Sequence, residues 1–146
     1  MKIEYDWRAG MDRETLYVTA HPSNRQWVTK LLHQEQLTVQ SALNGHTYRL
    51  DYHEIVTITA LTQQSCVRTL SGQTYYVAGR LKALQYLAAA GLMRINNTTI
   101  LNLALITNFG TEKYARLVVE TTTGQQLIVS RHYAKQIREA LLCTKR

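Results

Sequence analysis

Short segments of alternating apolar and polar residues recur between about residue 46 and residue 129, and they are rich in β-branched and aromatic side chains. This period of two is typical of antiparallel strands with one buried face. Three boundaries between such segments carry a two-residue turn signal: Asn44-Gly45, Ser71-Gly72 and Thr123-Gly124. Because these dipeptides supply the positive φ of tight reverse turns, each predicts a β-hairpin.

Two further stretches extend the β prediction. Residues 108–113, which contain the sequence Asn-Phe-Gly, indicate a longer hairpin loop between strands at 103–107 and 114–120. Near the N-terminus, residues 2–7 and 14–20 show the same alternation and predict two more strands.

Helices are predicted at three places. Ser23 and Gln26 form a capping box that opens a helix over residues 23–36. One face of this helix would hold Trp27, Leu31 and Glu35. Together with the two preceding strands, it predicts a small β-β-α segment over residues 1–42, with a boundary near Ala42.

The other two helices lie in the mainly β part, residues 43–146. The second runs from Arg80 to Ala90 and stops at Gly91, and its expected core positions are Leu81, Leu84, Leu87 and Ala88. The third begins after Ser130 as N-cap and spaces Tyr133, Ile137 and Leu141 four residues apart. The fold class is therefore mainly β (α+β), with small antiparallel sheets and short helices.

Charge is distributed unevenly along the chain. Residues 1–60 hold six Lys or Arg and seven Asp or Glu, a net charge of −1. Residues 61–146 hold eleven and three, a net charge of +8. Clustered cations release counterions from a phosphate backbone, so the second part favours a polyanionic partner. A basic domain that is merely soluble is the alternative.

Catalysis and metal binding are poorly supported. Ser130 and His132 are close in sequence, but no G-x-S-x-G elbow surrounds the serine. The histidines lack the paired spacing of zinc ligands, there is no C-x-x-C pair, and every glycine is isolated, so no phosphate-binding loop is present. We expect no enzyme activity, no catalytic or metal site, no cofactor and no small-molecule substrate.

The cysteine content and the apolar segments indicate the cellular compartment. Cys66 and Cys143 are too few for a disulfide framework, and no apolar segment is long enough for a signal sequence or a membrane span. We expect a cytoplasmic protein with reduced thiols.

The start of the third helix is unusual. Arg131 and His132 occupy the first turn, where acidic residues are favoured, and Lys135 and Arg138 continue a basic stripe. This arrangement is consistent either with a bound anion or with a solvated basic face.

Four consecutive polar residues, 96–99, interrupt an apolar stretch and follow Arg94. Asparagine can pair with adenine in the major groove, and threonine hydroxyls can hold phosphates. The same residues could equally form a turn between two strands, because asparagine tolerates left-handed φ.

From about Asn44 to Leu142 the chain resembles the LytTR DNA-binding domain of bacterial transcription regulators. The resemblance is carried by residues 51–55, 65–77, 79–87, 92–102 and 129–135. The last two segments, LMRINNTTILN and VSRHYAK, are the specific ones. The first of them is similar to the family pattern F-x-R-x-H-x-S-x-x-V-N. It departs from that pattern at Asn96, where histidine is usual, and conservatively at Thr99 and Leu101.

The resemblance implies a fold of small antiparallel sheets that reads double-stranded DNA with loops and strand ends. Asn97 and Arg131 are the implied main contacts, and a third contact falls within residues 63–65. The full set of candidate DNA-binding residues is Gln63, Gln64, Ser65, Arg80, Lys82, Arg94, Asn96, Asn97, Thr98, Arg131, His132 and Lys135.

The resemblance also implies which molecules bind the protein. Residues 1–42 are too few for the receiver domain of a response regulator, so the chain is similar to stand-alone LytTR transcription regulators. These occupy paired promoter sites, which implies a homodimer at least on DNA, and are often encoded beside a small membrane protein that restrains them. From charge alone, an RNA-binding module or a basic protein adaptor remains the alternative.

Overall fold

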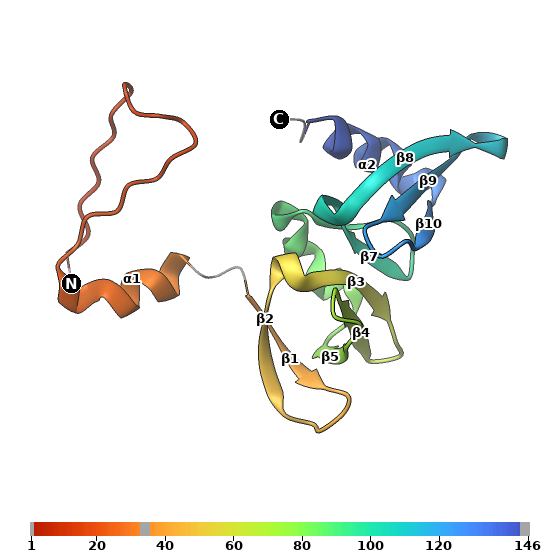
Figure 1. The fold of residues 1–146 in the computed structure, drawn as a ribbon, viewed down its shortest axis with the longest axis horizontal. Helices are drawn as coiled ribbons and strands as arrows, with labels where there is room; N and C mark the ends of the chain where they lie inside the picture. The colour runs from red at the N-terminus through yellow and green to blue at the C-terminus, as the bar shows by residue number, and fades with distance from the viewer. Residues whose placement is uncertain (1, 33–35, 144–146) are drawn as a thin grey trace. The chain divides into compact units, whose positions relative to one another are not determined.

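The computed structural model describes residues 2–32 and 36–143, with residues 29–32 described by their backbone alone. The chain divides into two compact units, residues 1–34 and 35–146 (Figure 1).

Ten strands between residues 36 and 143 form two antiparallel sheets, which confirms the predicted mainly β fold. The larger sheet has the order β2-β1-β5-β4-β3-β7-β6, and the smaller sheet has the order β10-β9-β8. Strands of the larger sheet are β1 (Gln36–Ser41), β2 (Thr47–Asp51), β3 (Ile55–Ala60), β4 (Gln64–Thr69), β5 (Thr74–Ala78), β6 (Leu92–Arg94) and β7 (Thr99–Asn102). Strands of the smaller sheet are β8 (Ile106–Glu112), β9 (Arg116–Thr121) and β10 (Gln126–Val129).

The three predicted hairpins are confirmed, although each connection between their strands is longer than two residues. Gly45, Gly72 and Gly124 have φ of 71°, 83° and 81°, the left-handed conformation that glycine adopts without steric cost. They join β1 to β2, β4 to β5 and β9 to β10.

The first core lies between the larger sheet and a 3-10 helix, η3 (Leu81–Ala90). Side chains three residues apart eclipse one another in a 3-10 helix, so Leu81, Leu84 and Leu87 line one edge and are buried. Ala88, predicted to face this core, is exposed, because the α-helical period used for that prediction does not apply here. Gly91 ends the helix with a φ of 88°, as predicted.

The second core lies between the smaller sheet, the β6–β7 hairpin and α2 (Arg131–Cys143). Ile137 is fully buried in it, and Tyr133 and Leu141 pack against it, which confirms the predicted apolar face. Successive residues of a strand point to opposite faces, and this places Ile100 in the first core and Leu101 in the second.

The predicted loop at residues 108–113 is wrong. Strand β8 runs through this segment and pairs with β9, with Phe109 opposite Val119 and Glu112 opposite Arg116. Gly110 is not in the left-handed region and lies inside the strand. The reversal instead takes place at a 3-10 turn, η5 (Lys113–Ala115).

The two strands predicted within residues 2–20 are also wrong, since no strand is formed there. A strand is stabilised by packing its apolar face on a second layer, and no residue from 2 to 28 is buried. A hydrogen-bonded turn at Asp12 is present, in which Asp12 accepts from the hydroxyl of Thr15 at 2.7 Å and from the amide of Glu14 at 3.1 Å. These bonds lower the pKa of the Asp12 carboxyl.

The predicted helix in this unit forms as η1 (Pro22–Asn24) followed by α1 (Arg25–Leu32). His21, rather than Ser23, is the N-cap, because Pro22 fits the first helical position and His21 Nδ1 accepts from the Ser23 amide at 3.1 Å. Glu35 lies outside the described residues, as does the side chain of Leu31. The units divide between Gln34 and Glu35, ahead of the boundary expected near Ala42, because β1 pairs with β2 and β5.

Among the described helices, none combines the length and the apolar character that a bilayer span requires.

Candidate nucleic-acid interface

Three segments that are distant in sequence meet at one end of the larger sheet, and we call them the three-loop surface: residues 61–64, 95–98 and 130–132. The Ala60 amide donates to the carbonyl of Thr98 at 2.8 Å, which joins the end of β3 to the β6–β7 loop. The Ser130 amide donates to the carbonyl of Ile95 at 2.8 Å, which joins the start of α2 to the same loop. The fold therefore brings the two most specific sequence segments together.

The β6–β7 loop is held by its own polar groups. Asn96 Oδ1 accepts from the amide and from the hydroxyl of Thr98, both at 2.9 Å. Arg94 Nη2 donates to the Asn97 carbonyl at 2.8 Å. The segment is thus a turn, and it leaves the side chain of Asn97 exposed at its tip.

Arg94 spans from this loop to α2. Its guanidinium carbon lies 5.8 Å from the centre of the Tyr133 ring, and its Nε is buried with no hydrogen-bond partner among the described residues. A guanidinium bonded to a carbonyl and stacked on an aromatic ring is fixed in place. Arg94, predicted as a contact, is therefore better placed to shape the loop than to reach DNA.

The β3–β4 loop presents two glutamines. Gln63 and Gln64 are exposed, and the Leu61 amide donates to the Gln64 carbonyl at 2.9 Å to close the turn. Ser65 is fully buried, and its hydroxyl donates to the Gly79 carbonyl at 2.9 Å. The prediction of Ser65 as a DNA contact is not compatible with this burial; the residue ties β4 to the end of β5.

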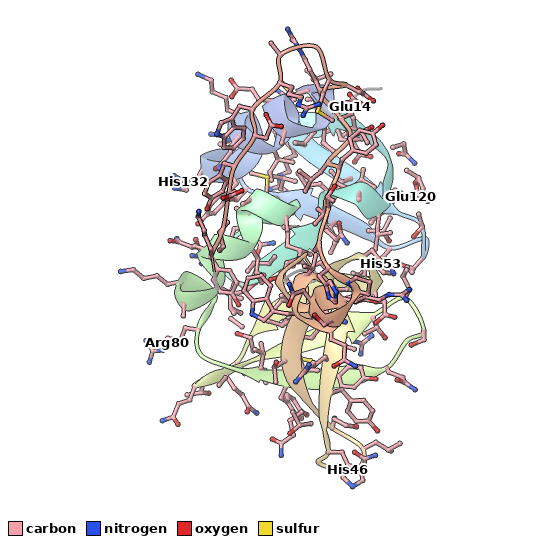
Figure 2. The ribbon with its side chains drawn as sticks, turned by 90° about the vertical axis from the view of Figure 1, so that its left-hand side faces the viewer. Glu14, His46, His53, Arg80, Glu120 and His132 are labelled. Carbon is pink, nitrogen blue, oxygen red and sulfur yellow. The ribbon has the colours of Figure 1, made fainter. Side chains whose placement is uncertain are left out.

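The hydrogen bond between Ser65 and Gly79 also places two cations beside the glutamines. Gln64 pairs with Ala78 across β4 and β5, and Arg80 and Lys82 follow as exposed side chains at the start of η3. Figure 2 shows Arg80 and His132 on one side of the domain, with Glu120 and His53 on the other.

The start of α2 brings two cations to the three-loop surface: Arg131 lies within it and Lys135 lies one turn beyond it. Both side chains are exposed, as is His132, and the first turn of the helix has no acidic residue. The unsatisfied amides of a helix N-terminus add partial positive charge. Arg138 points elsewhere, since its Nη2 donates to Thr111 Oγ1 at 2.8 Å.

Within the part of the chain that the structure describes, no ion pair joins Arg131 or Lys135 to a carboxylate; the ion pairs between Lys2 and Glu4 and between Arg8 and Asp6 lie in the N-terminal unit. The resulting local field favours an anionic partner over a neutral one.

One group of potential metal ligands was not foreseen from the sequence. Donor atoms of Asp51, His53 and Glu54 lie within 4.8 Å of one another, with Gln36 Nε2 donating to Asp51 at 2.8 Å. His53 and His132 lie on different sides of the domain (Figure 2), so this group is separate from the three-loop surface.

The sequence interpretation also missed the turn between β8 and β9. Lys113 and Arg116 flank it, and Tyr114 and Ala115 have left-handed φ of 64° and 58°. This conformation costs roughly 1–2 kcal/mol for each residue with a side chain. Lys113 ended the predicted loop, but a Tyr-Ala dipeptide carries no turn signal, so nothing in the sequence placed the reversal at residues 114 and 115.

Comparisons with protein families and with solved structures agree with the mainly β fold. The family of LytTr DNA-binding domains matches residues 45–142, well over half of the chain. Among solved structures, the LytTr DNA-binding domain of a Bacillus cereus protein described as a methyl-accepting/DNA response regulator superposes with a TM-score of 0.64. The two share 17% identity over 74% of this chain and 97% of that one, and no curated protein matches. The chain, with its two antiparallel sheets and its Asn97 and Arg131 loops joined at one end, therefore belongs to the LytTR family of DNA-binding domains.

Proposed function

We propose that the protein is a sequence-specific, double-stranded DNA-binding transcription regulator that reads its site through the three-loop surface. The observation that carries this proposal is the pair of hydrogen bonds from Ala60 to Thr98 and from Ser130 to Ile95. They hold exposed asparagine, glutamine and arginine side chains on one surface without a recognition helix. Rigid presentation of such groups is what base readout requires.

The contacts divide by chemistry into reading and anchoring. Asn97, Gln63 and Gln64 have the carboxamides that pair with adenine edges, and Arg131 has the fork that fits guanine or phosphate. Phosphate anchoring falls to the remaining exposed polar and cationic side chains: Arg80, Lys82, Thr98, His132 and Lys135. Asn96 and Arg94 support the loop.

The N-terminal unit supports a dimer. Trp7, Leu16 and Tyr5 are 87%, 76% and 73% exposed, which leaves apolar surface that another copy would cover. Two linked DNA-binding modules raise the effective concentration of the second binding event, so a homodimer would suit paired promoter sites. In this proposal the protein acts in the bacterial cytoplasm, and a small membrane protein encoded nearby restrains it.

A binding experiment tests the proposal directly. A duplex selected from a random-sequence pool by repeated binding to the full chain is compared with a scrambled duplex in gel shifts. We expect preferential binding of the selected duplex and a steep loss of affinity with salt, since each neutralised phosphate contributes about −0.9 to the log-log slope. Equal competition by single-stranded RNA, or no enrichment of any duplex, would contradict the proposal.

A further inference from the structure

The turn between β8 and β9 differs from the other hairpin turns of the domain that use left-handed φ. Two consecutive left-handed residues favour Asn-Gly or a similar dipeptide, and the chain places a left-handed glycine, at positions 45, 72 and 124, in the β1–β2, β4–β5 and β9–β10 turns. Here the two positions are Tyr114 and Ala115, with φ of 64° and 58°. Residues kept in a strained conformation concentrate at functional sites.

Packing does not compensate this strain. Tyr114 is 81% exposed, and within the described part of the chain its hydroxyl has no hydrogen-bond partner and its ring has no aromatic neighbour. A large side chain held outward on a strained turn contributes nothing to the core. Its position therefore points to a partner outside the chain.

The location of the turn indicates which partner that is. Tyr114, Arg116, Ser130 and Arg131 line one surface hollow of about 520 Å³, so the turn lies beside the start of α2. Lys113 and Arg116 flank the tyrosine, and Glu112, opposite Arg116 in the strand register, is the nearest acidic residue along the hairpin. The phenol thus shares its surroundings with Arg131.

We propose that Tyr114 is a DNA-binding residue whose hydroxyl donates a hydrogen bond to a phosphate of the duplex, next to the groove that Arg131 enters. This proposal rests on the proposed function, because it needs duplex DNA on the three-loop surface. Tyrosine hydroxyls are regular phosphate donors, and such contacts fix the register of a protein on DNA without reading sequence. The flanking Lys113 and Arg116 strengthen the same contact electrostatically.

Removal of one oxygen atom provides the first test. Tyr114→Phe in the full chain should bind both the selected and the scrambled duplex about tenfold more weakly, the expected loss for a hydrogen bond to a charged group. The salt slope should stay unchanged, because a neutral phenol releases no counterion. Tyr48→Phe is the matched control, since Tyr48 lies on β2 at the far edge of the larger sheet and should bind as the parent does.

A second variant tests whether the strained turn is needed for DNA binding or is only tolerated by the fold. Tyr114→Asn combined with Ala115→Gly supplies the dipeptide that this turn prefers, so Tm should rise by a few degrees while duplex affinity falls about tenfold. Parental affinity in this variant and in Tyr114→Phe would overturn the proposal. Arg131→Ala in the same assay distinguishes failure of the Tyr114 proposal from failure of the proposed function. If Arg131→Ala also binds as the parent does, the proposed function itself has failed.

Discussion

The Nη2 atom of Arg94 donates a 2.8 Å hydrogen bond to the carbonyl oxygen of Asn97, three residues along the chain. The two residues thus have different tasks within one motif: the arginine fixes the backbone of the loop, and the asparagine presents its side chain to the outside. Because Arg94 also lies over the ring of Tyr133, the conformation of the loop depends on the position of α2.

Arg94→Ala should lower affinity for the selected duplex by roughly tenfold, because the loop loses the bond that positions Asn97. Binding to scrambled duplex should change less. Arg49→Ala removes the same charge from β2, away from the three-loop surface, and should leave both affinities unaltered. An equal loss for both duplexes in gel shifts would assign Arg94 to phosphate anchoring instead.

Asn97→Ala should lose about 1–3 kcal/mol of preference for the selected duplex over random DNA, the discrimination expected of a bidentate base contact. Lys135→Ala should weaken binding to both duplexes equally and reduce the salt slope by about one. The comparison is a pair of fluorescence-anisotropy titrations at several salt concentrations. Unchanged preference in Asn97→Ala would make Asn97 an ordinary turn residue.

Ser65 and Gln64 are adjacent but should respond in opposite ways. Ser65→Ala leaves the Gly79 carbonyl without its bond from the buried hydroxyl, so urea unfolding should show a loss of about 1–3 kcal/mol. Gln64→Ala should keep parental stability and bind the selected duplex less tightly. If Gln64→Ala instead unfolds more easily at parental affinity, the glutamine is structural.

Asn102 should be among the most sensitive positions of the fold. Its buried amide donates to the Ile55 carbonyl at 2.9 Å and to the Tyr52 carbonyl at 3.2 Å, and its oxygen accepts from the Ala104 amide at 3.1 Å. Asn102→Ala should therefore destabilise the domain by more than about 3 kcal/mol, measured by thermal and urea unfolding. A loss near zero would mean that water replaces all three bonds.

Self-association through the N-terminal unit is testable in the full chain. Trp7→Asp combined with Leu16→Asp should shift sedimentation from dimer to monomer at micromolar concentration, because both side chains are exposed and apolar in the described structure. Leu43→Asp, which changes an exposed leucine in the β1–β2 turn, is the control. A monomeric parent, or a double variant that stays dimeric, would remove this unit from the proposed interface.

Sequence reasoning succeeded where one local signal decides the structure. Glycine dipeptides located three hairpins, and Gly91 located the end of η3. It failed where the outcome depends on distant parts of the chain: Phe109 and Gly110 look like a loop, yet they form a strand because β9 pairs with them. The alternation of residues 2–20 is present, but the pattern does not reveal whether a second layer exists for it to pack on.

The candidate site shows the same division. The family-like segments made Asn97 and Arg131 candidates, and both are exposed. The burial of Ser65 and the position of Arg94 depend on contacts with Gly79 and Tyr133 that no local pattern contains. The sequence does not predict the turn at Tyr114, because tyrosine and alanine rarely adopt the left-handed φ that they have here.

The alternation of Ile100 and Leu101 between the two cores has a consequence for cooperativity. A hairpin that supplies side chains to both cores cannot leave one without disturbing the other, so the domain should open as one unit instead of two. Amide hydrogens of β3 and β9 should then exchange with the same free energy of opening. DNA that binds the tip of the β6–β7 hairpin would slow amide hydrogen exchange throughout the domain, including in strands remote from the bound DNA.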